Sequence, residues 1–163
     1  MNKEFTLKIA SNPNTPAYTL NDIMNQNNDY DILCALASNP NTPGYSLRKL
    51  MSDNNDSGIL TAIANNPGTP PLVLREIIEK SDDMSILLSI AKRKNLPALI
   101  FSDLARKTNN CTILKAIAEN PSVPTVALRI IIEKKPPESI LNAIASNPNT
   151  PPIILSTIAK LMS

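Results

Sequence analysis

The sequence contains no histidine, no tryptophan and only three glycines among its 163 residues. Without histidine, the chain can build neither a Ser–His or Cys–His nucleophile pair nor a histidine metal site. Three isolated glycines do not form a glycine-rich phosphate loop. The two cysteines, Cys34 and Cys111, make no Cys-x-x-Cys motif. We therefore expect no metal, no cofactor, and two free thiols in a reducing compartment.

Acidic residues occur in near pairs, but their setting favours a solvated role. Asp82 and Asp83 stand at an expected helix start, where the helix dipole favours negative charge, and Glu76 and Glu79 share a polar face with Arg75 and Lys80. A catalytic dyad requires a buried cleft, of which the sequence gives no sign. We expect no catalytic residues and no enzymatic activity.

Long apolar runs are also missing. The first ten residues lack the apolar stretch of a signal peptide, and no later run approaches the ~18 residues of a membrane span. We expect a soluble cytoplasmic protein that has no membrane partner.

Asparagine–proline pairs recur with constant spacing. They begin at residues 12, 39, 66, 120 and 147, and Arg93-Lys94 occupies the remaining slot. A second proline follows three residues after each slot, at positions 16, 43, 70, 97, 124 and 151. The period of 27 divides the chain into six units, 1–27, 28–54, 55–81, 82–108, 109–135 and 136–162, which we expect to form one repeat domain over residues 1–163.

Each unit predicts two helices. Apolar residues at i, i+1, i+4 and i+5, such as Ile32, Leu33, Leu36 and Ala37, indicate a first helix over about 29–38 in the second unit. An Asn or Asp precedes this helix as an N-cap, and the Asn-Pro pair ends it. The Thr-Pro that follows predicts a second helix over about 43–53, with Thr as N-cap and Pro as first residue.

The string Ala-Leu-Ala-Ser-Asn-Pro-Asn-Thr-Pro and its leucine continuation over residues 35–50, repeated with Ile over 143–158, resembles the leucine-rich repeat variant family. The resemblance implies a superhelix of alternating helices, similar in shape to HEAT and armadillo arrays, that serves as an interaction scaffold. The unit here is longer than the family's usual one, which favours two true α-helices. The iron–sulfur cluster of the family's best-known member is not expected, because its cysteines are missing. We predict an all-α, right-handed α-solenoid of six 27-residue two-helix repeats without β-strands.

Basic residues concentrate in the second half of the chain. Residues 1–81 hold 6 basic and 8 acidic side chains, a net charge of −2, whereas residues 82–163 hold 10 and 6, a net charge of +4. Stacking is expected to bring Lys92, Arg93 and Lys94 near Arg106 and Lys107. Such a patch suits a phosphate backbone or an acidic protein. A solvated loop in a degenerate unit is the other interpretation, and the scarcity of aromatics weakens base stacking.

A further apolar column falls at one position of the second helices and includes Tyr18, Tyr45, Leu72 and Leu99. An exposed column would form a protein-binding stripe, whereas an inward tilt would bury it in the seam between the two helices.

The two terminal units also differ. Thr6 and Lys8 replace apolar residues and suggest a solvent-facing N-terminal cap, while the last unit keeps its apolar residues. Self-association through this open end, by Ile154, Ile158, Leu161 and Met162, is one hypothesis. The overall expectation is a protein–protein interaction scaffold, with electrostatic nucleic-acid binding through the basic half as the alternative.

Overall fold

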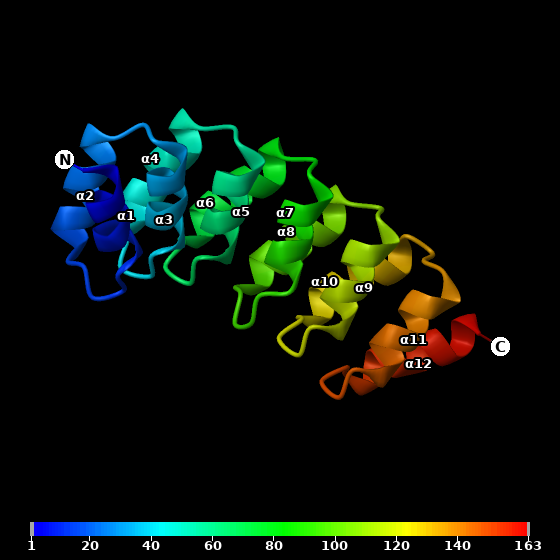
Figure 1. The fold of residues 1–163 in the computed structure, drawn as a ribbon. Coiled ribbons are helices and arrows are strands. Elements are labelled where there is room, and N and C mark those ends of the chain that lie inside the picture. Colours follow the sequence, from blue (N-terminus) through cyan, green and yellow to red (C-terminus); the bar gives the residue numbers. More distant parts are fainter. Residues whose placement is uncertain (1, 163) are drawn as a thin grey trace. The chain divides into compact units, whose positions relative to one another are not determined.

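The computed structural model describes residues 2–162, and these residues form twelve α-helices and no β-strand. The helices are drawn in Figure 1 and are α1 (Lys3–Ser11), α2 (Ala17–Gln26), α3 (Tyr30–Ser38), α4 (Gly44–Asp53), α5 (Ser57–Asn65), α6 (Pro71–Lys80), α7 (Met84–Ala91), α8 (Ala98–Lys107), α9 (Cys111–Glu119), α10 (Thr125–Glu133), α11 (Glu138–Ser146) and α12 (Pro152–Leu161). None of these helices combines the length and the hydrophobicity that crossing a membrane requires.

The odd-numbered helices begin at the expected side-chain caps. The carboxylate of Asp29 accepts the amides of Asp31 and Ile32, and the same arrangement starts α5 at Asp56 and α9 at Asn110. Asn2 and Asp83 cap α1 and α7 by accepting one backbone amide each, whereas α11 follows Pro137 without a side-chain cap. The predicted Asn and Asp N-caps are therefore confirmed. A short polar side chain at this position satisfies first-turn amides that have no partner within the helix.

The prediction that Thr caps the even-numbered helices is wrong. Pro43 is the N-cap residue of α4, and no side chain caps that helix. The buried hydroxyl of Thr42 instead donates to the carbonyl oxygen of Leu36 at 2.6 Å, as Thr15, Thr69 and Thr150 do to the carbonyls of Ile9, Ile63 and Ile144. The hydroxyl is directed toward the last turn of the preceding helix, where carbonyl groups lack their full set of helical donors. The carbonyl oxygen of Leu36 accepts this bond in addition to a longer one, at 3.3 Å, from the backbone amide of Asn39.

The described chain divides into two compact bodies. The N-terminal body is Met1–Ile77 and the C-terminal body is Ile78–Ser163, with the division inside α6. In the N-terminal body, α1, α3 and α5 lie side by side as one layer (Figure 1). In the C-terminal body, α7, α9 and α11 form one layer and α8, α10 and α12 a second. Each body thus packs alternate helices against each other, as helical repeats do.

The core consists of the predicted apolar columns. Leu36, Ile63, Ile90, Ile117 and Ile144 are all fully buried, and Ala37, Ala64, Ala91 and Ala118 beside them are equally inaccessible. The small alanine side chains let neighbouring odd-numbered helices approach closely. Thr6, in contrast to the expected solvent-facing cap, is buried, and its hydroxyl is satisfied by donating to the carbonyl of Asn2 one turn earlier. Lys8 is exposed and pairs with Glu4.

Buried asparagines tie the loops of successive units together. The side-chain amide of Asn39 donates to the carbonyls of Ala10 and Asn12 at 2.7 and 2.8 Å, and Asn66 repeats this toward Ala37 and Asn39. In the C-terminal body, the same two bonds are made by Asn120 toward Ala91 and Arg93, and by Asn147 toward Ala118 and Asn120.

In each case the asparagine side-chain oxygen also accepts the backbone amide two residues ahead. We call Asn39, Asn66, Asn120 and Asn147 the asparagine ladder. The sequence identified this Asn only as a helix stop, yet its side chain donates two hydrogen bonds to the preceding unit.

Candidate functional site

In each body, an apolar ridge runs along the starts of the even-numbered helices. Its members share one position of the 27-residue unit and are 50–72% exposed: Tyr18, Tyr45 and Leu72 in the N-terminal body, and Leu99, Val126 and Ile153 in the C-terminal body. The inward-facing alternative for this column is therefore wrong. The ridge residue precedes the buried core position by two residues, as Tyr45 precedes the fully buried Leu47. Two residues are about 200° apart around a helix, so burying one exposes the other.

Charged residues border the ridge on the same helices. In the N-terminal body, Arg48 and Glu76 form an ion pair at 2.7 Å. Arg48 follows the ridge residue Tyr45 by three positions, and Glu76 follows the ridge residue Leu72 by four. In the C-terminal body, Ile153 borders a hollow of about 340 Å³ between α10 and α12, together with Ile132, Arg129 and Glu133. An apolar centre with a charged rim has the composition of many protein-binding surfaces.

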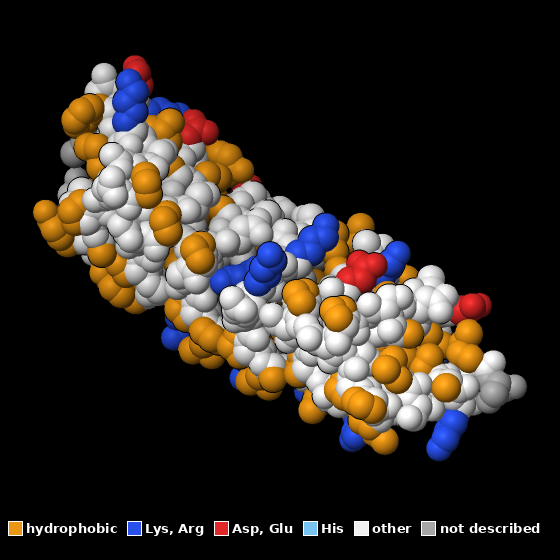
Figure 2. All heavy atoms as spheres, turned by 90° about the horizontal axis from the view of Figure 1, so that it is seen from below, with side chains coloured by type: hydrophobic (Ala, Val, Ile, Leu, Met, Phe, Trp, Pro, Cys, Tyr) orange, Lys and Arg blue, Asp and Glu red, His pale blue; other side chains and the backbone are white. Residues whose placement is uncertain are grey.

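The basic segment Lys92–Lys94 lies in the loop between α7 and α8. Figure 2 views the molecule from below Figure 1 and shows several basic side chains (blue) on this face. Lys92 and Lys94 are exposed, whereas Arg93 is partly buried, and this burial lowers the pKa of its guanidinium. Asn95 completes the loop with a φ of 59°, a left-handed conformation that Asn tolerates better than most residues.

Arg106 and Lys107 do not join this group. They form the last turn of α8, while Lys94 precedes the first, so about 14 Å of helix at 1.5 Å per residue separates the two sets. Lys107 is paired with Asp82 at 2.7 Å, and Arg106 lies 3.7 Å from Asp103. The expectation that stacking brings the five basic residues together is therefore wrong. The reason is that loop residues and helix C-termini lie at opposite edges of the layer.

The C-terminal residues named for self-association divide into two pairs. Ile154 and Ile158 are 2% and 7% exposed, since they form the face of α12 that packs toward α10 and α11. They are therefore not available as a contact surface, which corrects the hypothesis. Leu161 and Met162, beyond the packed turns, are at least half exposed.

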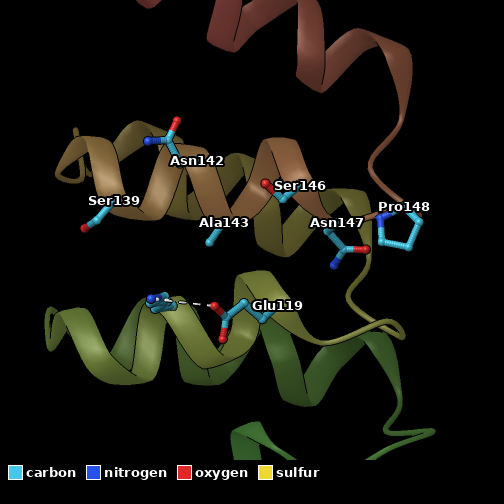
Figure 3. A pocket seen from close by; sticks show the side chains of 8 residues that line it. Glu119, Ser139, Asn142, Ala143, Ser146, Asn147 and Pro148 are labelled. Carbon is cyan, nitrogen blue, oxygen red and sulfur yellow. Dashed lines mark ion pairs between the residues drawn. The ribbon is translucent and has the colours of Figure 1, made fainter.

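A shallow hollow recurs between odd-numbered helices. Between α3 and α5 it measures about 380 Å³ and is lined by Tyr30, Cys34, Ser38 and residues of α5. At the equivalent unit positions between α9 and α11, a hollow of about 340 Å³ holds the ion pair of Lys115 and Glu119 at 3.7 Å. Figure 3 shows Glu119 and Ala143 facing each other across this second hollow. The hydroxyl, amide and paired charged groups that line these hollows can form hydrogen bonds with a ligand.

Tyr30 differs from an ordinary surface tyrosine. A hydrogen bond with Cys34 and the negative charges of Cys34 and Asp56 raise the pKa of its phenol from 10.0 to about 12. The raised pKa has a definite consequence for stability. Between pH 10 and 12 an unfolded chain loses this proton while the folded chain keeps it, so folding stability falls as the pH rises through this window.

We therefore expect the ultraviolet absorbance of the Tyr30 phenolate to develop at a pH about two units higher than that of free tyrosine. The signal is isolated by subtracting the titration of Tyr30→Phe from that of the unmodified protein. Replacing Cys34 with alanine removes the largest cause and should shift the Tyr30 titration to lower pH. An unchanged titration in Cys34→Ala would contradict this origin of the raised pKa.

Among residues 2–162 no three His, Cys, Asp or Glu side chains are placed to hold a metal ion. Both cysteines are free, Cys34 partly buried and Cys111 exposed. The chain matches no protein-family model, no curated protein and no solved structure.

Proposed function

We propose that this chain is a non-enzymatic scaffold for protein–protein interaction, built as a right-handed α-solenoid of six two-helix repeats of the leucine-rich repeat variant type. The exposed apolar ridge carries this proposal. It is supported by the 27-residue period of the sequence, by the packing of alternate helices and by the ladder bonds, which repeat at intervals of 27 and 29 residues. The two free thiols are consistent with a protein that functions in a reducing compartment such as the cytoplasm.

The ridge suits a protein partner better than it suits a nucleic acid. Burying apolar surface contributes about 25 cal/mol per Å², so half-exposed Tyr and Leu side chains gain most from an apolar partner surface. Tyrosine is also enriched among residues that dominate binding energy. A phosphate backbone needs converging cations, but the structure places Lys94 and Lys107 at opposite ends of α8. The partner is therefore expected to present apolar side chains to Tyr18 and Tyr45.

A photo-crosslinking side chain placed at residue 45, compared with one at residue 30, tests the proposal in cells. Tyr30 is the matched control, because it is also a half-exposed tyrosine but lies on the odd-numbered layer. We expect a specific protein to crosslink from position 45 and not from position 30. Its affinity for purified Tyr18→Ser/Tyr45→Ser should fall about 30-fold or more, as for the loss of a central aromatic anchor, while Tyr30→Ser stays unchanged. Crosslinking from position 30 alone would overturn the proposal.

A further inference from the structure

A lysine side chain is bound at the end of an even-numbered helix in the C-terminal body. The ammonium group of Lys134, which directly follows α10, donates to the carbonyl oxygens of Arg106 and Thr108 at 3.1 and 2.6 Å. It also donates to the side-chain oxygen of Asn109 at 2.9 Å. Carbonyl groups at the C-terminal end of a helix lack helical donors and carry partial negative charge, so a cation both satisfies and neutralises them.

The preceding unit binds a lysine in a similar way. Lys107 occupies the unit position of Lys134, and its ammonium group donates to the carbonyl oxygen of Glu79 on α6 at 3.3 Å. It also lies 2.7 Å from a carboxylate oxygen of Asp82, which occupies the unit position of Asn109. Two successive units therefore hold a primary ammonium group between the end of the preceding even-numbered helix and the side chain that follows it.

The N-terminal body presents the same acceptors without a lysine. A hollow of about 320 Å³ between the C-terminal ends of α2 and α4 is lined by Asn25, Asn27 and Asn28, which occupy the unit positions of the three groups that bind Lys134. The carbonyl oxygens of Asn25 and Asn27 receive no hydrogen bond from residues 2–162. The unit position of the lysine is taken by Asp53, which also lines the hollow and has no ion-pair partner in this part of the chain.

The remaining walls of the hollow suit an aliphatic stem. Met24, Leu33 and Leu50 line it and are only 2–8% exposed, so they present an apolar surface below the polar groups. The methylene groups of a lysine pack along such a surface while its ammonium group stays with polar acceptors. The hollow therefore matches both parts of a lysine side chain.

One cation already lies at the hollow, but it leaves the backbone acceptors free. The ammonium group of Lys49 donates to the side-chain oxygen of Asn25 at 2.9 Å and not to a carbonyl of the main chain. Its charge is offset by Asp53, one helical turn later on α4. The negative ends of the α2 and α4 dipoles are then left to attract a further cation.

We propose that the hollow between α2 and α4 binds a lysine side chain of another protein. The ammonium group donates to the main-chain carbonyls of Asn25 and Asn27 and to the side chain of Asn28, and Asp53 supplies the opposite charge. A lysine is favoured because this chain itself places lysines in the equivalent positions of two other units. The site is separate from the apolar ridge, since Asp53 lies eight residues after Tyr45, or about 12 Å along α4.

The test titrates the full chain with lysine blocked as its Nα-acetyl methylamide and follows nitrogen–proton NMR spectra. We expect saturable shifts of the backbone amides over residues 25–28 and 53–54. The same compound acetylated on its side-chain nitrogen has lost the charge and should bind at least about tenfold more weakly. Equal binding of the two compounds, or shifts confined to other residues, would overturn the proposal. Tighter binding of 1,4-diaminobutane than of blocked lysine would instead assign the site to a small diamine and would also overturn it.

Asp53→Lys fills the hollow from within the chain. The introduced side chain occupies the unit position of Lys134, so we expect binding of blocked lysine to be lost and the melting temperature to rise. Asp22→Lys is the matched control, because it makes the same change of charge at an exposed residue of α2 that does not line the hollow. It should alter the affinity by less than about twofold. Retained binding in Asp53→Lys, or an equal loss in Asp22→Lys, would contradict the proposed site.

Asn28→Asp is expected to act in the opposite direction. It reproduces the pairing of Asp82 with Lys107, so the affinity for blocked lysine should rise about three- to fivefold. Circular dichroism confirms that each variant remains folded. An affinity that falls in folded Asn28→Asp would show that this side chain does not face the ammonium group.

Discussion

Replacing Asn66 with aspartate is expected to lower the free energy of unfolding by about 3 kcal/mol or more. Asn66 is 2% exposed, and its amide donates to the carbonyls of Ala37 and Asn39 at 2.7 and 2.8 Å. Aspartate has nearly the same shape, so packing is preserved. Its oxygen instead faces two buried carbonyls that have lost their donor, and each such loss costs about 1–3 kcal/mol.

The matched control for this change is Asn65→Asp, one residue earlier in α5. Asn65 is exposed, so its replacement should cost less than about 1 kcal/mol, mainly through the helix dipole. Urea denaturation followed by far-ultraviolet circular dichroism measures both variants. Hydrogen exchange should show the largest loss of protection in the loops on either side of Asn66. Equal stability of Asn65→Asp and Asn66→Asp would show that the ladder does not stabilise the fold.

Replacing Phe101 with alanine is expected to lower the free energy of unfolding by about 3–5 kcal/mol. Phe101 is completely buried and has the largest volume among the fully buried side chains of the core. The other buried members of its column are Leu20, Leu47, Leu74 and Leu128. The larger ring therefore fills space that leucine fills elsewhere, and alanine leaves a cavity that close-packed neighbours fill only in part.

Phe101→Leu distinguishes the volume of the side chain from its aromatic character. Because leucine suits this position in other units, we expect it to cost about 1 kcal/mol. Leu99→Ala, two residues earlier on the exposed ridge, should change stability by less than about 0.5 kcal/mol. Thermal and urea denaturation of the three variants give this order directly. A small effect of Phe101→Ala would mean that the core of the C-terminal body rearranges to fill the cavity.

The sequence by itself was sufficient to place the helices. The apolar spacing around Ile32 and Leu36, the capping side chain of Asp29 and the Asn-Pro stop at Asn39 act within one or two helical turns. Such signals depend only on neighbouring residues, so each can be read from a short window. For the same reason, the burial of the leucine and isoleucine columns was predictable wherever the helical face was unambiguous.

Contacts between residues 27 or more positions apart were decided by tertiary structure. The role of Asn66 in the ladder depends on which carbonyls the preceding loop presents, and no local pattern contains that information. The exposure of Tyr45 and the burial of Ile154 likewise depend on how the helices rotate and stack. An apolar column at helical spacing shows that a face exists, but only packed neighbours determine whether that face is covered.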